Sequence, residues 1–409
     1  MASTCRFCAT PLEHEFVNLG LSPISNAFVK PADVDKDEAF YPLHAFVCGE
    51  CFLVQLEEFE SPDEIFSDYV YFSSYSDSWL EHAKRFVDAA TRRFELGPDS
   101  LVMEVASNDG YLLQYFVEGG VPVLGIEPAS NVAEVARKAG VDTIDEFFGV
   151  ALAERLRDEG RTADLLVGNN VLAHVPDIND FVGGLKIALS ENGVLSMEFP
   201  HLLKLIQQTQ FDTIYHEHFS YLSLIAVQRI FRHHGLEVFD VEELTTHGGS
   251  LRVFAQHPNG KQATTTTVEN VLGDEKQAGM DSLAGYQNFA EKVAKVKDDL
   301  LAFLAAADAA GKSVVGYGAP AKGNTLLNFC GVGPDSIQYT VDRSPYKQDH
   351  LLPGTHIPVY APEQIDASRP DYVLILPWNL QDEIVQQLSH IKDWGGQCVV
   401  PIPELRVLE

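Results

Sequence analysis

The chain has 409 residues, of which 45% are hydrophobic and 22% are charged, and its formal net charge at pH 7 is −30. This length exceeds what one core supports and predicts two large domains with a smaller one. So acidic a surface repels a phosphate backbone, which argues against nucleic acid as a partner. No apolar run approaches the roughly 18 to 20 residues that cross a bilayer, so no membrane partner is expected.

The N-terminal segment carries two C-x-x-C pairs. It lacks the basic and apolar regions of a secretory signal, which predicts a cytoplasmic protein in which paired cysteines bind metal rather than form disulfides. Cys5 and Cys8, with Cys48 and Cys51, supply the four sulfurs of a closed tetrahedral Zn²⁺ site. Such a site stabilises the fold and does no chemistry, so we expect zinc removal to unfold the first ~60 residues.

Residues 69–75, Y-V-Y-F-S-S-Y, connect this module to the next domain. Their aromatic and hydroxyl side chains show no helical period. We expect this segment to close as a lid over a cofactor.

Short apolar runs alternate with helical segments from residue 101 onward. We expect strands at 101–105, 121–126, 164–168 and 193–198, helices at 111–118 and 129–139, and an antiparallel strand pair at 236–241 and 250–255. The alternation predicts a doubly wound α/β sheet, whose ligands bind at the carboxyl ends of the strands.

Polar residues stand where the first two of these strands end. Gly110 lets the backbone approach a ligand closely, and Glu127 can bind both hydroxyls of a ribose. The loop has one glycine rather than three, which favours S-adenosylmethionine, a cofactor without phosphate, over a nicotinamide dinucleotide. Glu104 and Asp109 are then expected to face the amino-acid end of the cofactor. The alternatives are a core strand with a polar turn, a nicotinamide-dependent oxidoreductase and a non-catalytic scaffold.

Residues 215–218, Tyr-His-Glu-His, are the densest candidate catalytic cluster. His216 and His218 are too close in sequence for an H-E-x-x-H zinc motif. Their alternation predicts that one points into a site and the other away. A histidine near a carboxylate is the usual construction of a general base, and the alternative is a polar surface turn. Residues 169–176 follow the strand expected at 164–168, the fourth strand of a methyltransferase sheet, and form a second place where catalytic groups are expected.

The C-terminal third predicts a second α/β unit. Residues 281–310 have apolar positions at helical spacing. Residues 313–323 predict a strand followed by a glycine-containing loop, with Lys322 at the start of the next helix. A helix N-terminus with a lysine is suited to binding an anionic group. Further strands are expected at 337–341 and 372–376, before Asp342 and Trp378-Asn379. The alternative to a nucleotide site is a decayed structural repeat.

Taken in order, the motifs resemble the bacterial sugar C-methyltransferase family over essentially the whole chain. They are C-x-x-C…C-x-x-C, E-x-x-S-N-D-G, G-I-E-P, N-N-x-L-A-H-x-P, Y-H-E-H-F-S-Y, H-G-G-S-L-R, G-Y-G-A-x-A-K and P-W-N. The resemblance implies a zinc module at 1–68, an S-adenosylmethionine domain at 69–260 and a Rossmann-like nucleotide-sugar domain at 261–409. It also implies that a base removes the proton α to a ring ketone and that the enolate attacks the sulfonium methyl.

The resemblance implies roles for individual residues by motif position. His218 is the expected base, with Glu217 orienting it or contacting the sugar. The other expected contacts with the sugar or the enolate oxygen are Tyr215, His174 and Tyr69. The expected cofactor contacts are Glu104, Ser107, Asn108, Asp109, Gly110, Glu127 and Asn170. The expected substrate contacts are His247, Tyr317, Lys322, Asp342, Trp378 and Asn379.

Two positions depart from the family pattern. His216 stands where members have Asp, which leaves His216 as an alternative base, and Gly323 stands where they have Ser. The expected substrate is a thymidine-diphospho-4-keto-6-deoxysugar methylated at C-3, with a guanosine carrier as an alternative. O- or N-methylation of a nucleotide sugar is the competing reaction. The protein is expected to be a monomer or a small homo-oligomer.

Overall fold

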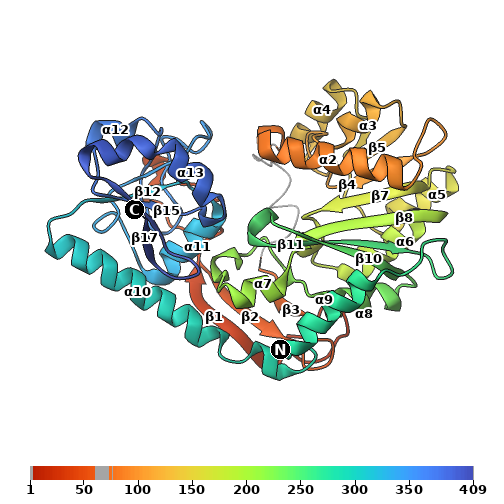
Figure 1. The fold of residues 1–409 in the computed structure, drawn as a ribbon, viewed down its shortest axis with the longest axis horizontal. Helices are drawn as coiled ribbons and strands as arrows, with labels where there is room; N and C mark the ends of the chain where they lie inside the picture. Colours follow the sequence, from red (N-terminus) through yellow and green to blue (C-terminus); the bar gives the residue numbers. More distant parts are fainter. Residues whose placement is uncertain (1–2, 60–72, 76, 409) are drawn as a thin grey trace.

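The computed structural model describes residues 3–59, 73–75 and 77–408, which form three β-sheets flanked by helices (Figure 1). The first sheet is antiparallel and consists of β1 (His14–Ser22), β2 (Tyr41–Val47), β3 (Val54–Leu56) and β9 (Ser220–Tyr221). In the pairing of β3 with β9, Gln55 lies opposite Ser220. Because β9 begins two residues after His218, the candidate catalytic segment is joined directly to the N-terminal module.

The second sheet has seven strands in the order β10-β11-β8-β7-β4-β5-β6. They are β4 (Val102–Val105), β5 (Val123–Ile126), β6 (Thr143–Ile144), β7 (Ala163–Asn169), β8 (Leu189–Pro200), β10 (Glu237–Leu244) and β11 (Ser250–Gln256). Strands β4 to β8 are parallel, and β10 and β11 are antiparallel to their neighbours. The predicted doubly wound sheet and its antiparallel strand pair are both confirmed.

Helices cover both faces of the seven-stranded sheet. They are α2 (Asp77–Arg93), α3 (Leu113–Glu118), α4 (Ser130–Lys138), α5 (Val150–Asp158), α6 (Ile178–Ala188), α8 (Leu224–His233) and α9 (Thr266–Gln277). Helix α7 (Leu202–Gln207) packs instead into the core of the N-terminal sheet and the C-terminal unit. Figure 1 shows α2, α3 and α4 on one face and α6, α8 and α9 on the other. Short 3₁₀ turns carry site residues: η2 (Ser73–Tyr75), η3 (Leu172–His174), η4 (Phe211–Thr213) and η5 (Thr246–Gly248).

The third sheet has the order β14-β13-β12-β15-β16-β17 and is parallel except for β17. Its strands are β12 (Val314–Tyr317), β13 (Thr340–Val341), β14 (Val359–Tyr360), β15 (Tyr372–Ile375), β16 (Gln397–Val400) and β17 (Arg406–Leu408). Its helices are α10 (Phe289–Ala309), α11 (Ala321–Cys330), α12 (Gln364–Ser368) and α13 (Gln381–Gln387). The chain thus contains a second Rossmann-like α/β unit, as predicted.

Two expected elements of this unit are shorter than predicted. The helix expected over 281–310 begins only at Phe289, because Asn288 adopts φ = 64°, a left-handed conformation that a right-handed helix does not contain. Before it lies a 3₁₀ turn, η6 (Leu283–Tyr286). The strand expected over 337–341 is reduced to the two residues of β13.

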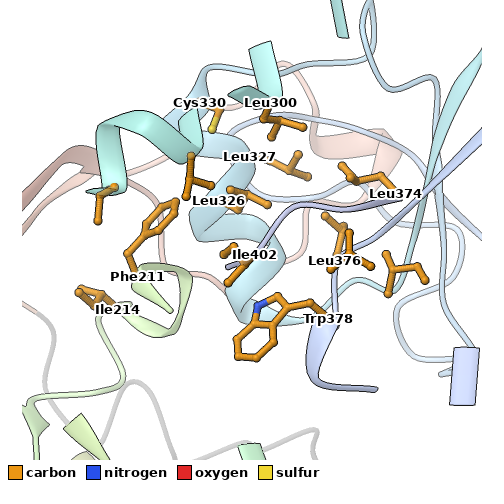
Figure 2. Close-up of a cluster of buried hydrophobic side chains, with 14 of the residues drawn as sticks. Phe211, Ile214, Leu300, Leu326, Leu327, Cys330, Leu374, Leu376, Trp378 and Ile402 are labelled. Carbon is orange, nitrogen blue, oxygen red and sulfur yellow. The ribbon is translucent and has the colours of Figure 1, made fainter. Parts of the chain in front are cut away.

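One hydrophobic core joins the N-terminal sheet, the segment before His218 and the C-terminal unit. Figure 2 shows Phe211, the first residue of η4, and Ile214, which follows that turn, on the side of α11 that carries Leu326, Leu327 and Cys330. The hydroxyl of Thr325 on the same helix donates to the Ile214 carbonyl at 3.1 Å. The C-terminal unit therefore holds the segment that leads into the candidate catalytic cluster.

Within the part of the chain that the structure describes, no helix is both long enough and apolar enough to cross a bilayer.

Candidate active site

The four cysteines of the N-terminal module converge on one point. Their sulfurs all lie within 4.8 Å of one another, with 3.5 Å between Cys5 and Cys51 and 3.5 Å between Cys8 and Cys48. A tetrahedral Zn²⁺ with Zn–S bonds of about 2.3 Å places its sulfurs about 3.8 Å apart, so this donor set fits zinc. Gln55 donates a further hydrogen bond to the Cys5 sulfur at 3.2 Å. No position is left for water, which makes the site structural.

Two imidazoles, those of His174 and His218, meet edge to face. The rings of His174, on η3, and His218 are 4.6 Å apart between centroids. Nδ1 of His218 lies 2.8 Å from the Thr213 carbonyl oxygen, and Nδ1 of His174 lies 2.7 Å from that of Glu217. A carbonyl oxygen only accepts, so we assign the proton to Nδ1 in both rings. Nε2 of each ring then carries the lone pair that a base needs.

Both histidines are held neutral. Burial lowers the pKa of His218 well below its usual value of 6.5, and the basic groups nearby, His174 first among them, disfavour a positive charge on it further. Burial also lowers the pKa of His174 to about 4. The Tyr215 hydroxyl lies 2.9 Å from Nε2 of His218 and donates to it. A neutral imidazole with its Nε2 engaged by a phenol is the resting form of a general base.

The two neighbours of His218 in the motif point elsewhere. Nε2 of His216 donates to the Pro42 carbonyl at 3.1 Å, and its ring packs against Tyr41 and Phe59 of the N-terminal module. Two roles were expected for Glu217. The structure does not support the first, because the Glu217 carboxyl does not orient His218. That carboxyl accepts two hydrogen bonds from Asn26, at 2.7 and 3.0 Å, and it is the Glu217 backbone that orients His174.

The Glu217 carboxyl predicts a measurable pH dependence of stability. Burial raises its pKa from 4.5 to about 7 against the opposing effects of Asn26 and Lys347. The folded state therefore binds this proton more tightly than the unfolded state, so its contribution to stability is full below about pH 4.5 and is lost as the pH rises through about 7. Glu217→Gln, which keeps an acceptor for Asn26, is expected to gain roughly 3 kcal/mol relative to wild type across this range.

Urea unfolding at a series of pH values measures this difference in the free energy of unfolding. Glu81→Gln, at an exposed position on α2, is the matched control. A constant difference between Glu217→Gln and wild type over the whole range would contradict the prediction.

Unpaired polar atoms collect at the carboxyl ends of β4 and β7. Glu104 is fully buried, and neither of its carboxyl oxygens has a hydrogen-bond partner. Burial raises its pKa well above the usual value. The other buried side-chain oxygens here without a partner belong to Ser107, Asp109, Asn169 and Asn170. Buried polar atoms without partners indicate a polar ligand, and this donor and acceptor set fits the amino-acid end of S-adenosylmethionine.

The loop after β4 is tightly turned. Asn108 (φ = 48°) and Gly110 (φ = 80°) both lie in the left-handed region. A Cβ on Gly110 would also lie 3.0 Å from a Val141 methyl, so packing as well as the turn requires glycine here. The Glu127 carboxyl receives backbone N–H groups of Asn108 and Ala129, each at 3.0 Å, which places it at the mouth of this loop.

The turn η2 is fastened to the same loop. Backbone N–H groups of Ser73 and Ser74 donate to the side chains of Asn108 and Asp109, at 2.8 and 3.1 Å. These two serines belong to the segment that was expected to close over the cofactor. Tyr69, the remaining candidate of that segment, lies outside the described residues.

A buried ion network that the motifs did not predict lies behind the cofactor loops. Glu198, at the end of β8, accepts from Arg252 at 2.6 Å and from Thr246 at 3.0 Å, and His82 of α2 lies 2.9 Å away. Burial alone would raise the pKa of Glu198, but His82 and Arg252 lower it to about 2. Thr246 precedes His247, so the network fixes the H-G-G turn. The sequence contained one signal for this network: a charged residue lies inside each of two expected strands, Glu198 in 193–198 and Arg252 in 250–255.

Arg252→Met is expected to destabilise the protein by roughly 3–5 kcal/mol, because it leaves the Glu198 carboxylate buried without its cation. The free energy of unfolding in urea measures the loss. Arg161→Met, which removes an exposed pair with Asp142, is the control and should cost less than about 1 kcal/mol. Similar losses in the two variants would show that the buried network is not a special source of stability.

The expected substrate residues of the C-terminal unit divide into two groups. Lys322 donates to Asn379 at 2.8 Å and lies 4.7 Å from the centre of the Trp378 ring. The Trp378 indole donates to Asp212 at 2.7 Å, and a Cβ on Gly248 would lie 2.6 Å from the same indole. These residues therefore meet the H-G-G turn and the segment before His218.

Tyr317 and Asp342 have their partners within the C-terminal unit itself. The Tyr317 hydroxyl donates to Gln387 at 2.7 Å, and Asp342 accepts the backbone N–H groups of Ala319 and Ser344. His247 adopts φ = 55°, and its ring meets that of Trp79 edge-on at 5.5 Å. A cavity of about 430 Å³ opens beside Trp378 and Asn379 and is also lined by Gln208 and Arg406.

Comparisons with known proteins agree with this arrangement. Three family models match successive parts of the chain: a zinc binding domain over residues 5–66, a methyltransferase domain over 79–241 and a C-methyltransferase C-terminal domain over 245–403. Together with the sheet order and the cofactor loops, they define an S-adenosylmethionine-dependent methyltransferase with a zinc-binding module.

The chain is 36% identical to C-methyltransferase NovU of Streptomyces niveus over 404 residues, which cover 99% of this chain and 96% of NovU. It therefore belongs to the C-methyltransferase family that includes NovU.

Two more distant relatives match part of the chain. A ubiquinone biosynthesis O-methyltransferase of Rhodopseudomonas palustris is 27% identical over 116 residues, which cover 26% of this chain and 46% of that protein. The crystal structure of magnesium protoporphyrin IX methyltransferase from Synechocystis PCC 6803 with bound SAH has a TM-score of 0.36 and 15% identity, covering 44% of this chain and 83% of that one.

Proposed function

We propose that this C-methyltransferase methylates a carbon of a nucleotide-linked keto-deoxysugar, at C-3 of a thymidine-diphospho-4-keto-6-deoxysugar. The observation that carries the proposal is the pair of neutral histidines with Nε2 lone pairs, His174 and His218, beside the Tyr215 hydroxyl. Methyl transfer to carbon needs a base that removes a proton α to a carbonyl, and these groups supply one.

In the proposed reaction Nε2 of His218 takes the proton from the carbon next to the ring ketone. The C–H electron pair becomes the enolate, whose oxygen is the ketone oxygen. Tyr215, released from its bond to His218, donates to that oxygen, and His174 lies beside it. Preplaced donors of this kind stabilise a developing oxyanion strongly.

When bound, S-adenosylmethionine supplies an electrophilic methyl group on a sulfonium. The residues proposed to hold it are Glu104, Ser107, Asn108, Asp109, Gly110, Glu127 and Asn170. The enolate carbon would be the nucleophile toward that methyl group, and His218 would pass its proton to solvent after the product leaves.

We propose that the nucleotide binds to the C-terminal unit near Lys322, Trp378 and Asn379. The protein carries a net charge of −30, so an anionic substrate requires a local cation. Lys322 packs against Trp378, whose indole donates to Asp212, and Asp212 precedes the Thr213 carbonyl that orients His218. A diphosphate at Lys322 would therefore lie near the segment that holds the base. The adjoining cavity of about 430 Å³ is in the usual size range for small-molecule sites.

The test is to incubate the zinc-loaded protein with S-adenosylmethionine and thymidine-diphospho-4-keto-6-deoxysugars, with and without a 3-amino group. The expected product is heavier by one CH₂ unit, and NMR places the new methyl on C-3. In D₂O without cofactor, deuterium should enter at C-3. A methyl found on oxygen or nitrogen, without deuterium at carbon, would replace this proposal with the O- or N-methyltransferase alternative. Turnover of guanosine-linked sugars alone would overturn the choice of carrier.

A further inference from the structure

Arg6 stands between two zinc ligands and contacts both loops that carry the paired histidines. Its Nη1 donates to the Pro176 carbonyl at 2.7 Å, and its guanidinium carbon lies 5.3 Å from the centre of the Phe219 ring. Pro176 follows His174 by two residues, and Phe219 follows His218 directly. One side chain of the zinc module therefore touches the two segments whose relative position sets the spacing of the imidazoles.

The guanidinium is itself fixed from the module side. Nη2 of Arg6 donates to the Leu56 carbonyl at 2.5 Å, and its backbone N–H donates to Gln55 at 2.9 Å. Gln55 in turn donates to the Cys5 sulfur and pairs with Ser220 across β3 and β9. The position of Arg6 is thus set by the same residues that surround the metal.

We propose that Arg6 is a positioning residue that holds His174 and His218 at their working separation. Arginine suits this task because its planar fork donates to two carbonyls in fixed directions while one face covers an aromatic ring, and lysine cannot do all three at once. The zinc module then contributes to the reaction by fixing the geometry of the histidine pair, although no metal ligand touches the substrate. The proposal rests on the proposed role of His218.

Arg6→Gln and Arg6→Lys test the proposal. The measurements are zinc content, S-adenosylmethionine affinity by calorimetry, the kcat and KM of sugar methylation, and long-range ¹H–¹⁵N spectra of histidine-labelled protein. Signals are assigned with His174→Gln and His218→Gln. Both Arg6 variants are expected to retain zinc and cofactor affinity, to lose about 10²-fold in kcat with little change in KM, and to show His174 and His218 as mixtures of Nδ1–H and Nε2–H tautomers.

Arg229→Gln is the matched control. Arg229 also clamps a zinc knuckle, donating to the Glu50 carbonyl at 2.6 Å with its guanidinium carbon 5.0 Å from the Phe52 ring centre. Neither Glu50 nor Phe52 belongs to a histidine loop, so the tautomers and kcat should stay as in wild type.

If Arg6→Gln loses zinc, Phe219→Leu removes the ring beneath the guanidinium and leaves the knuckle intact, and the same measurements then decide. Unchanged tautomers and kcat in the zinc-loaded Arg6 or Phe219 variants would overturn the proposal. Altered tautomers in a protein that methylates no sugar would support the positioning role and reject only the proposed function.

Discussion

His218→Gln is expected to lower turnover by about 10²- to 10⁴-fold while S-adenosylmethionine binds with wild-type affinity. Glutamine keeps a donor for the Thr213 carbonyl but has no basic nitrogen, so the substitution removes the proton acceptor and little of the packing. Deuterium uptake at the α carbon in D₂O, without cofactor, should fall in parallel, because it reports the proton transfer alone.

His216→Gln is the matched control, since it changes the same residue type two positions away. The His216 side chain donates to Pro42 and packs against the N-terminal module, so the variant should lose stability rather than basicity. Calorimetry measures cofactor binding in both variants. If His216→Gln stops deuterium uptake and His218→Gln does not, the base is His216 and the orientation argument fails.

The pH profile adds a second check on the base. Burial lowers the pKa of His218 well below 6.5, so the basic form dominates at neutral pH. The kcat/KM for methylation is therefore expected to hold its plateau below pH 6.5 and to fall only as the medium becomes more acidic. A midpoint of the kcat/KM profile at or above pH 6.5 would contradict the lowered pKa of the buried His218 imidazole.

Removal of zinc is expected to unfold the N-terminal sheet and to abolish turnover. Structural Zn²⁺ contributes about 10–16 kcal/mol to folding in zinc-finger peptides, which matches the whole stability of a typical domain. The loss should spread beyond the cysteines, because β3 pairs with β9 and β9 follows His218. A strong chelator should therefore remove protection against hydrogen exchange at Ser220 and Tyr221 together with activity.

Cys48→Ser should reproduce the effect of the chelator, and Cys398→Ser serves as the control. Cys398 is a buried cysteine on β16, away from the zinc ligands. Metal analysis, circular dichroism and exchange mass spectrometry measure the three consequences. Zinc-free protein that keeps its amide protection at β9 and its turnover would refute a supporting role for the metal.

The parts of the fold that follow from local pattern were predictable. Runs such as 101–105 and 164–168 are apolar because parallel strands are covered on both faces, and both became strands of the seven-stranded sheet. The four cysteines were predictable because C-x-x-C spacing has few other uses in such a chain. Strand 337–341 was overestimated, since apolar character does not show how much of a run finds a partner.

The parts that depend on distant partners were not predictable. The carbonyl of Thr213 orients His218, and a backbone carbonyl has no sequence signature. The pairing of β9 with β3 involves only two residues of β9. In the sequence, Arg6 is simply a residue between the first two cysteines. Its contacts with Pro176 and Phe219 form only when the segments that carry these three residues come together in the fold. The orientation of Glu217 toward Asn26 was hidden for the same reason.

The pairing of β3 with β9 also has a consequence for synthesis of the chain on the ribosome. The two strands are separated by about 160 residues, which at 5–20 residues per second take roughly 10 to 30 s to make. During that interval the zinc knuckles can already bind metal, but the outer edge of β3 has no partner and is open to pairing with other chains. Nascent chains that stall before residue 220 should accordingly be the species that aggregate and recruit chaperones.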